Sequence, residues 1–131
     1  MVSQIQLRKL ANKVLKHEGL DGVEISVLLV DDAQIRKLNR KYLGKNRFTD
    51  VLAFRMGDGE FRQLNSQVLG DVVISVERAK KCSSIFETTY EKELSLYLIH
   101  GILHLIGYID TTKRGFAKMK KNQEEILEKS A

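Results

Sequence analysis

Two histidines and one aspartate lie close together in the last third of the sequence. His100 and His104 are four residues apart, a spacing that puts both side chains on one face of a helix. Gly107 follows where such a helix would end, and glycine readily takes the left-handed conformation that reverses a chain. A reversal there would return Asp110 to the two imidazoles. The spacing therefore predicts one divalent metal ion, zinc first, held by His100, His104 and Asp110.

Three protein ligands leave a coordination position for water, which is typical of catalytic zinc sites, whereas structural sites are closed by four ligands. Other interpretations stay open from the residues alone. Hydrogen bonds can satisfy a buried histidine pair, and Asp110 can cap a following helix that begins near Thr112. The spacing is also similar to the metzincin zinc-protease motif, but Gly101 stands where those proteases have their glutamate base.

The pattern of apolar residues and breakers predicts the elements that position these side chains. Five helices are expected, over residues 3–18, 32–44, 77–82, 89–106 and 112–129, and strands over 23–30, 51–54 and 71–76, with a loop or hairpin over 56–69. On the last helix, Phe116, Met119, Ile126 and Leu127 are expected as apolar contacts, and Tyr42 is expected on the apolar face of the second. The fold class is α+β (α/β-like), a single domain over 1–131 with a small mixed sheet of about four strands and about five helices.

Length and composition favour a cytoplasmic protein. The chain has 131 residues, enough for one domain with a real core. Cys82 is the single cysteine, so no internal disulfide can form and a reducing compartment is expected. No stretch approaches the roughly 18 uncharged apolar residues of a membrane span, so no membrane association is expected.

Basic residues are concentrated in two segments of the chain. The first cluster is Arg36, Lys37, Arg40, Lys41, Lys45 and Arg47, and the second is Lys113, Arg114, Lys118, Lys120 and Lys121. With a formal net charge of +5, such clusters can meet the phosphates of a nucleic acid. They can equally be solvated helix faces, so charge alone does not decide the partner.

Three stretches, in order, resemble the YbeY family of metal-dependent endoribonucleases. HGILHLIGYID (100–110) is similar to the family signature H-G-x-L-H-L-x-G-Y-D-H, TDVLAF (49–54) to T-D-V-L-S-F, and LGDVVIS (69–75) to L-G-D-I-x-I-S. The resemblance implies RNA cleavage in rRNA maturation or ribosome quality control, with rRNA as partner and the ribosome or a ribosomal protein as a further one. It implies catalysis through the metal held by His100, His104 and Asp110, while Lys45, Arg47 and Arg55 are candidates for binding the RNA backbone.

The chain departs from the family pattern at two positions. Asp110 stands where the family's third ligand is usually histidine, and Leu43 stands where the family commonly has an arginine linked to RNA cleavage. Aspartate is also a zinc ligand. The alternative to an endoribonuclease is a non-catalytic, ribosome-associated rRNA-binding factor with a structural metal, and a metzincin-like metallopeptidase is a further one.

Overall fold

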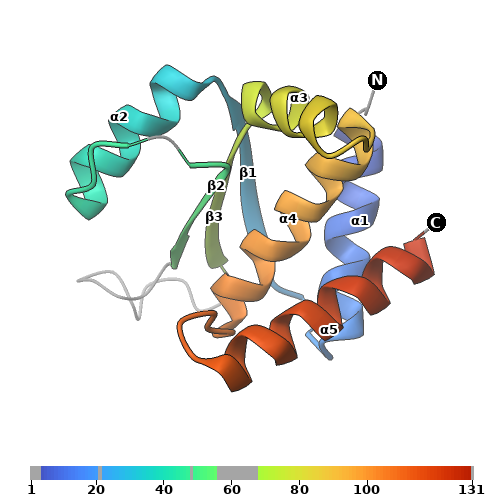
Figure 1. Ribbon diagram of the computed structural model, residues 1–131. Coiled ribbons are helices and arrows are strands. Elements are labelled where there is room, and N and C mark those ends of the chain that lie inside the picture. Colours follow the sequence, from blue (N-terminus) through green and yellow to red (C-terminus); the bar gives the residue numbers. More distant parts are fainter. Residues whose placement is uncertain (1–3, 21, 48, 56–67, 131) are drawn as a thin grey trace.

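The computed structural model describes residues 4–20, 22–47, 49–55 and 68–130, which form five helices and a small sheet. In chain order the elements are α1 (Gln4–His17), β1 (Glu24–Val30), α2 (Asp32–Leu43), β2 (Val51–Arg55), β3 (Val68–Ser75), α3 (Val76–Ile85), α4 (Tyr90–Ile106) and α5 (Lys113–Ser130). Figure 1 shows their arrangement, with α4 running beside the sheet and α5 lying across the lower ends of α4 and α1. The predicted α+β class is confirmed.

The sheet is mixed, with strand order β1-β3-β2. β1 runs parallel to β3, with Val27 opposite Val72, and β2 runs antiparallel to β3, with Leu52 opposite Val73. The described residues contain three strands, where about four were expected. Residues 56–67, part of the predicted loop or hairpin, lie outside the described residues.

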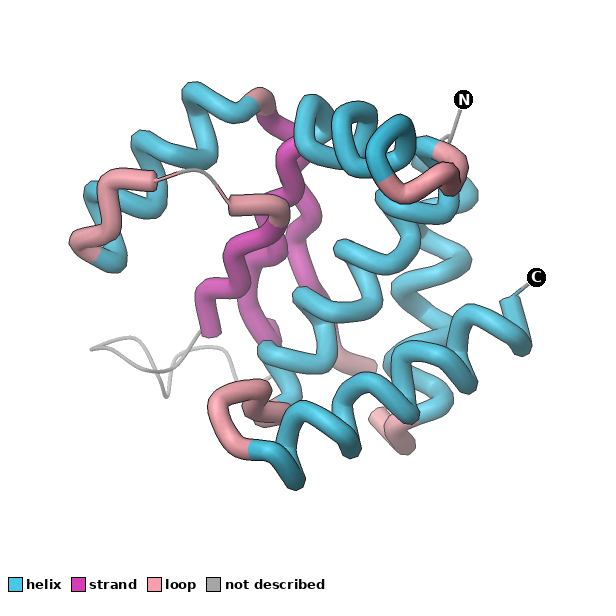
Figure 2. Tube along the Cα trace, in the orientation of Figure 1, coloured by secondary structure: helices cyan, strands magenta, loops and turns pink. Residues whose placement is uncertain are grey.

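The two faces of the sheet carry different apolar clusters. Val72 and Ile74 of β3 point into the main core, which α1, α4 and α5 complete. Val73 points the other way, into a smaller cluster with Ile35 of α2 and Leu52 of β2. Side chains that alternate across a strand explain this division. The sheet thus lies between α2 on one side and α1 with α4 on the other (Figure 2).

Helix α4 is the central element of the core. Thr89 caps its start by accepting a hydrogen bond from the amide of Lys92. Buried residues lie all round the helix, as expected for a helix enclosed by other elements. A Cβ at Gly101 would lie 2.5 Å from Cγ1 of Val72, so only glycine lets α4 approach the sheet this closely.

The predicted limits of α2 and α4 are confirmed to within a residue or two, because capping residues mark them. Asp31 and Gln34 form a capping box at the start of α2, and Gly44 ends it in the left-handed conformation. Two other boundaries were wrong, because β3 begins earlier, at Val68, and α3 continues to Ile85.

Two predicted core contacts were also wrong. Phe116 is 55% exposed, because it lies in the first turn of α5, while Met119 and Ile126 further along that helix carry the buried contacts. Tyr42 is 58% exposed and meets Phe54 edge to face at the rim of the smaller cluster.

Among the described helices, none is both long enough and apolar enough to cross a membrane.

Candidate metal centre

The chain reverses sharply at the end of α4. Gly107 has a φ of 118°, in the range that favours glycine. Its amide donates to the carbonyls of Leu103 and His104, and the amide of Tyr108 donates to Leu103, which satisfies two of the last four carbonyls of the helix. The segment after Gly107 therefore turns back along the helix and carries Asp110 to the histidines.

His100, His104 and Asp110 form a group that can hold a metal ion. Their ligand atoms all lie within 4.8 Å of one another. The two Nε2 atoms are 3.0 Å apart, and Oδ2 of Asp110 lies 3.4 Å from Nε2 of His104 and 3.8 Å from Nε2 of His100. Ligands about 2.0–2.1 Å from a tetrahedral ion lie about 3.3 Å from one another. The three donors fit such an ion with small movements of their side chains.

Both imidazoles are held through their other nitrogen. Nδ1 of His104 lies 3.1 Å from the carbonyl oxygen of Tyr108, and Nδ1 of His100 lies 2.5 Å from Oε1 of Gln123. A carbonyl oxygen only accepts hydrogen bonds, so Nδ1 of each ring is placed to donate, and Nε2 is the atom placed to bind a metal. Histidines that bind metals are oriented in the same way, by a hydrogen bond from the nitrogen that does not bind.

The two Nε2 atoms lie 3.0 Å apart, beside the Asp110 carboxylate. Two nitrogens at that separation share a positive ion, either a proton in a hydrogen bond or a metal ion. A divalent cation bound to all three atoms also balances the carboxylate charge. The donor set thus fits a metal ion on the contacts of the chain's own residues.

The ligands remain accessible from solvent. The side chains of both histidines are 29% exposed and that of Asp110 is 39% exposed. This partial exposure leaves a water molecule access to the ligand atoms. A hollow of about 390 Å³ lies on the turn itself, lined by Gly107, Tyr108 and Ile109 and by Lys118 of α5, and none of the three ligands lines it.

The three predicted RNA-binding residues take different positions. Arg55 ends β2 beside the site, where its Nε donates to the carbonyl of Leu105 and its Nη2 lies 3.2 Å from where a Cβ of Gly107 would be. Lys45 and Arg47 are exposed residues between α2 and β2, and no described contact joins them to the histidines. Arg55 thus lies against the last turn of α4, and no described contact joins it to a proposed ligand.

Two supporting residues of the site were not assigned a role from the sequence. Gln123 lies on the same face of α5 as the buried Met119 and Ile126. A polar residue within this apolar stripe is the sequence feature that could have indicated its role. Glu18, just after α1, accepts a hydrogen bond from the Tyr108 hydroxyl. Burial and this bond raise the pKa of Tyr108 to about 12, so the hydroxyl keeps its proton and anchors the turn.

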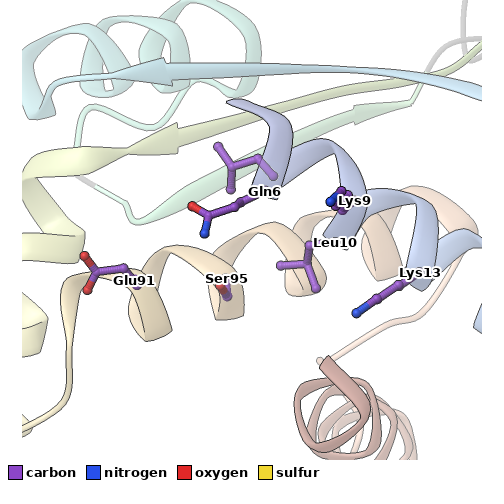
Figure 3. Close-up of a pocket in the computed structure, with 7 residues that line it drawn as sticks. Gln6, Lys9, Leu10, Lys13, Glu91 and Ser95 are labelled. Atoms are coloured by element: carbon purple, nitrogen blue, oxygen red, sulfur yellow. The ribbon is translucent and has the colours of Figure 1, made fainter. Parts of the chain in front are cut away.

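A second hollow, of about 280 Å³, lies between α1 and α4 at the opposite end of α4 (Figure 3). Gln6, Lys9, Leu10 and Lys13 of α1 line it, with Glu91 and Ser95 of α4. It contains no histidine and a single carboxylate, so its chemistry does not rival that of the metal centre.

A model of the family described as Endoribonuclease YbeY matches this chain over residues 1–131. The chain belongs to the YbeY family. A YbeY protein of Geobacter sulfurreducens is 40% identical over 125 residues, which are 93% of this chain and 83% of that protein. One of Syntrophus aciditrophicus is 37% identical over 93% of this chain and 78% of its own length. Both relatives carry the name Endoribonuclease YbeY.

The YbeY assignment agrees with the fold. A solution structure of a protein from Thermotoga maritima is similar to this chain with a TM-score of 0.63 and 32% identity, covering 98% of this chain and 86% of that one. The predicted family is thus confirmed.

Proposed function

We propose that this chain is a metal-dependent endoribonuclease that cleaves RNA phosphodiesters in rRNA maturation or ribosome quality control. The observation that carries the proposal is the convergence of two imidazole Nε2 atoms and one carboxylate, in a chain whose relatives are named endoribonucleases.

His100, His104 and Asp110 would hold the ion, with zinc as the first choice for two nitrogens and one oxygen. When bound, the ion supplies Lewis acidity toward a phosphoryl oxygen and lowers the pKa of a water molecule. The chain's own contribution is to fix the ligands. Gln123 and the Tyr108 carbonyl hold the two rings, and the Gly107 turn holds the carboxylate.

Arg55 is the proposed contact for the scissile phosphate. Its Nε donates a hydrogen bond to the Leu105 carbonyl, which holds the guanidinium at the end of α4. A fixed cation beside the metal ligands can hold the RNA backbone and stabilise charge that builds on the phosphorus centre. Lys45 and Arg47 would extend this contact along the RNA backbone, away from the metal.

The peptidase alternative loses support at Gly101. In zinc proteases of this spacing a glutamate at that position acts as the base. Here Gly101 faces the sheet, and even a Cβ there would lie 2.5 Å from Val72. No side chain at this position can reach a water molecule at the metal centre.

A non-catalytic rRNA-binding factor is the second candidate, and Leu43 favours it. This residue occupies the position where the family commonly has arginine, and its apolar side chain is 50% exposed. It can contact a base or another protein, but it cannot neutralise a phosphate.

Cleavage of structured ribosomal RNA separates the two candidates. We expect the zinc-loaded protein to cut internal phosphodiesters, a chelator to stop the cutting, and added zinc to restore it. His104→Ala should be inactive, whereas Lys92→Ala, an exposed change on the same helix, should retain activity. RNA binding without cleavage by the metal-loaded wild type would favour the non-catalytic factor.

A further inference from the structure

Gln123 of α5 reaches across to His100 of α4. Its Oε1 lies 2.5 Å from Nδ1 of the imidazole, and both residues are half-buried. Its neighbours on the inner face of α5, Met119 and Ile126, are each 2% exposed. A polar side chain within this apolar face has one described partner, the ring of His100.

This contact orients the His100 ring. An amide oxygen accepts, so Nδ1 is placed to donate, and Nε2 is the atom left for a metal. This Nε2 faces His104 and Asp110, at 3.0 Å and 3.8 Å. Without the acceptor, the proton can move to Nε2, and the ring can turn about its Cβ–Cγ bond.

We infer that Gln123 is a positioning residue, which holds His100 in the tautomer and ring orientation that metal binding requires. The inference rests on the proposed function, because it assigns Gln123 a role toward the same ion. The inference also makes the metal centre depend on α5, a helix that supplies no metal ligand.

The two histidines differ in how their orientation is secured. His104 depends on the Tyr108 carbonyl, a backbone group four residues away, so the end of α4 itself holds this ring. His100 depends on a side chain 23 residues along the chain, on a separate helix. The orientation of His100 is therefore complete only when α5 is docked on α4.

Zinc affinity of three variants tests the inference. Gln123→Leu removes the acceptor at similar size, and we expect a 10–100-fold weaker affinity, the usual effect of losing such a partner. Gln123→Glu keeps an acceptor and adds negative charge, so its affinity should equal or exceed that of the wild type. Glu124→Leu places the same leucine at the next, exposed position and should leave affinity unchanged.

Nitrogen NMR of the metal-free protein gives a readout that mere packing would not change. In the wild type and Gln123→Glu, the proton of His100 should be on Nδ1, and in Gln123→Leu it should be partly on Nε2. Equal zinc affinity in Gln123→Leu, a tenfold loss in Gln123→Glu, or a proton on Nε2 in the wild type would each overturn the inference. If wild-type protein bound no zinc, the proposed function would fail, while the position of the proton would still decide the role of Gln123.

Discussion

Asp110 is the residue at which this chain differs from its family in the proposed ligand set. Its carboxylate lies 3.4 Å and 3.8 Å from the two Nε2 atoms, and no described hydrogen bond joins it to the amides at the start of α5. Thr112, not Asp110, caps the start of α5, since its hydroxyl accepts a hydrogen bond from the amide of Gly115. The geometry thus favours a ligand over a helix cap.

Substitution of Asp110 tests this assignment. Asp110→Asn keeps the shape but removes the charge, so zinc should bind at least tenfold more weakly, as titration with a competing chelator would measure. Asp110→His restores the usual ligand of the family and should retain zinc, because imidazole binds it at a similar distance. A zinc affinity that Asp110→Asn leaves unchanged would return Asp110 to a purely structural role.

At the scale of elements, the approach of α4 to the sheet sets the position of both histidines. A Cβ at Gly101 would meet Val72 Cγ1 at 2.5 Å and Val51 Cγ2 at 3.1 Å, so two strands restrict this position. Alanine improves helix propensity by about 1 kcal/mol, but overpacking in a core costs about 1–3 kcal/mol. Crowding should therefore outweigh propensity.

We expect Gly101→Ala to lower the free energy of unfolding by up to about 2 kcal/mol, measured by urea denaturation. The double variant with Val72→Ala should show coupling, since the second change makes room for the added methyl group. A more stable Gly101→Ala protein would mean that α4 moves away from the sheet at little cost.

Asp32 joins α2 to β3 and α3. Its buried carboxylate accepts hydrogen bonds from the Ser75 hydroxyl, at 2.6 Å, and from Nζ of Lys81, at 3.1 Å. Burial alone would raise the pKa of Asp32, but these bonds and the nearby charges of Lys81 and Arg78 outweigh it and hold the pKa below the ordinary 3.8. Asp32 therefore stabilises the fold above that pH, and the contribution is lost as the pH falls through its lowered pKa.

Asp32→Asn should cost about 1–3 kcal/mol at pH 7, because the hydrogen bonds to a charged acceptor are weakened. The difference from the wild type should narrow as the pH falls below about 4, since Asp32 of the unfolded chain then takes up a proton and the folded carboxylate follows at its lowered pKa. Urea denaturation at a series of pH values measures both effects. A difference that stays constant with pH would show that the charge of Asp32 does not contribute.

At the scale of the whole molecule, the positive charge is divided between the two sides of the sheet. Lys37, Arg40 and Lys41 are exposed on α2, whereas Lys9, Lys13 and Lys16 belong to α1 on the opposite side (Figure 1). The loop that follows α2 carries Lys45 and Arg47 and leads into β2, which ends at Arg55 beside the metal centre. An RNA bound along the basic residues of α2 would therefore reach the proposed site more directly than one bound along α1.

RNA affinity should consequently depend on α2. Changing Lys37, Arg40 and Lys41 to glutamine should weaken RNA binding and reduce its dependence on salt, by about 0.9 or less in slope for each lost phosphate contact. The same change at Lys9, Lys13 and Lys16 is the matched control and should have a smaller effect. Equal losses from both triple variants would indicate diffuse attraction by net charge, and zinc binding should persist in each.

The sequence by itself determined the family, the class of fold and the three proposed ligands. Caps and breakers are local signals, so Asp31, Gly44, Thr89 and Gly107 marked the limits of α2 and α4 correctly. The spacing of His100 and His104 follows from the period of the helix. These features depend only on residues close together in the chain, so they can be predicted from the sequence.

Only the tertiary structure decided which segments far apart in the chain contact one another. The order β1-β3-β2, the exposure of Phe116 and the contact of Gln123 with His100 each join elements far apart in the chain. No local pattern encodes such contacts, because they depend on how helices pack on the sheet. The orientation of the His100 ring depends on one of these contacts, because Gln123 reaches it only when α5 packs against α4.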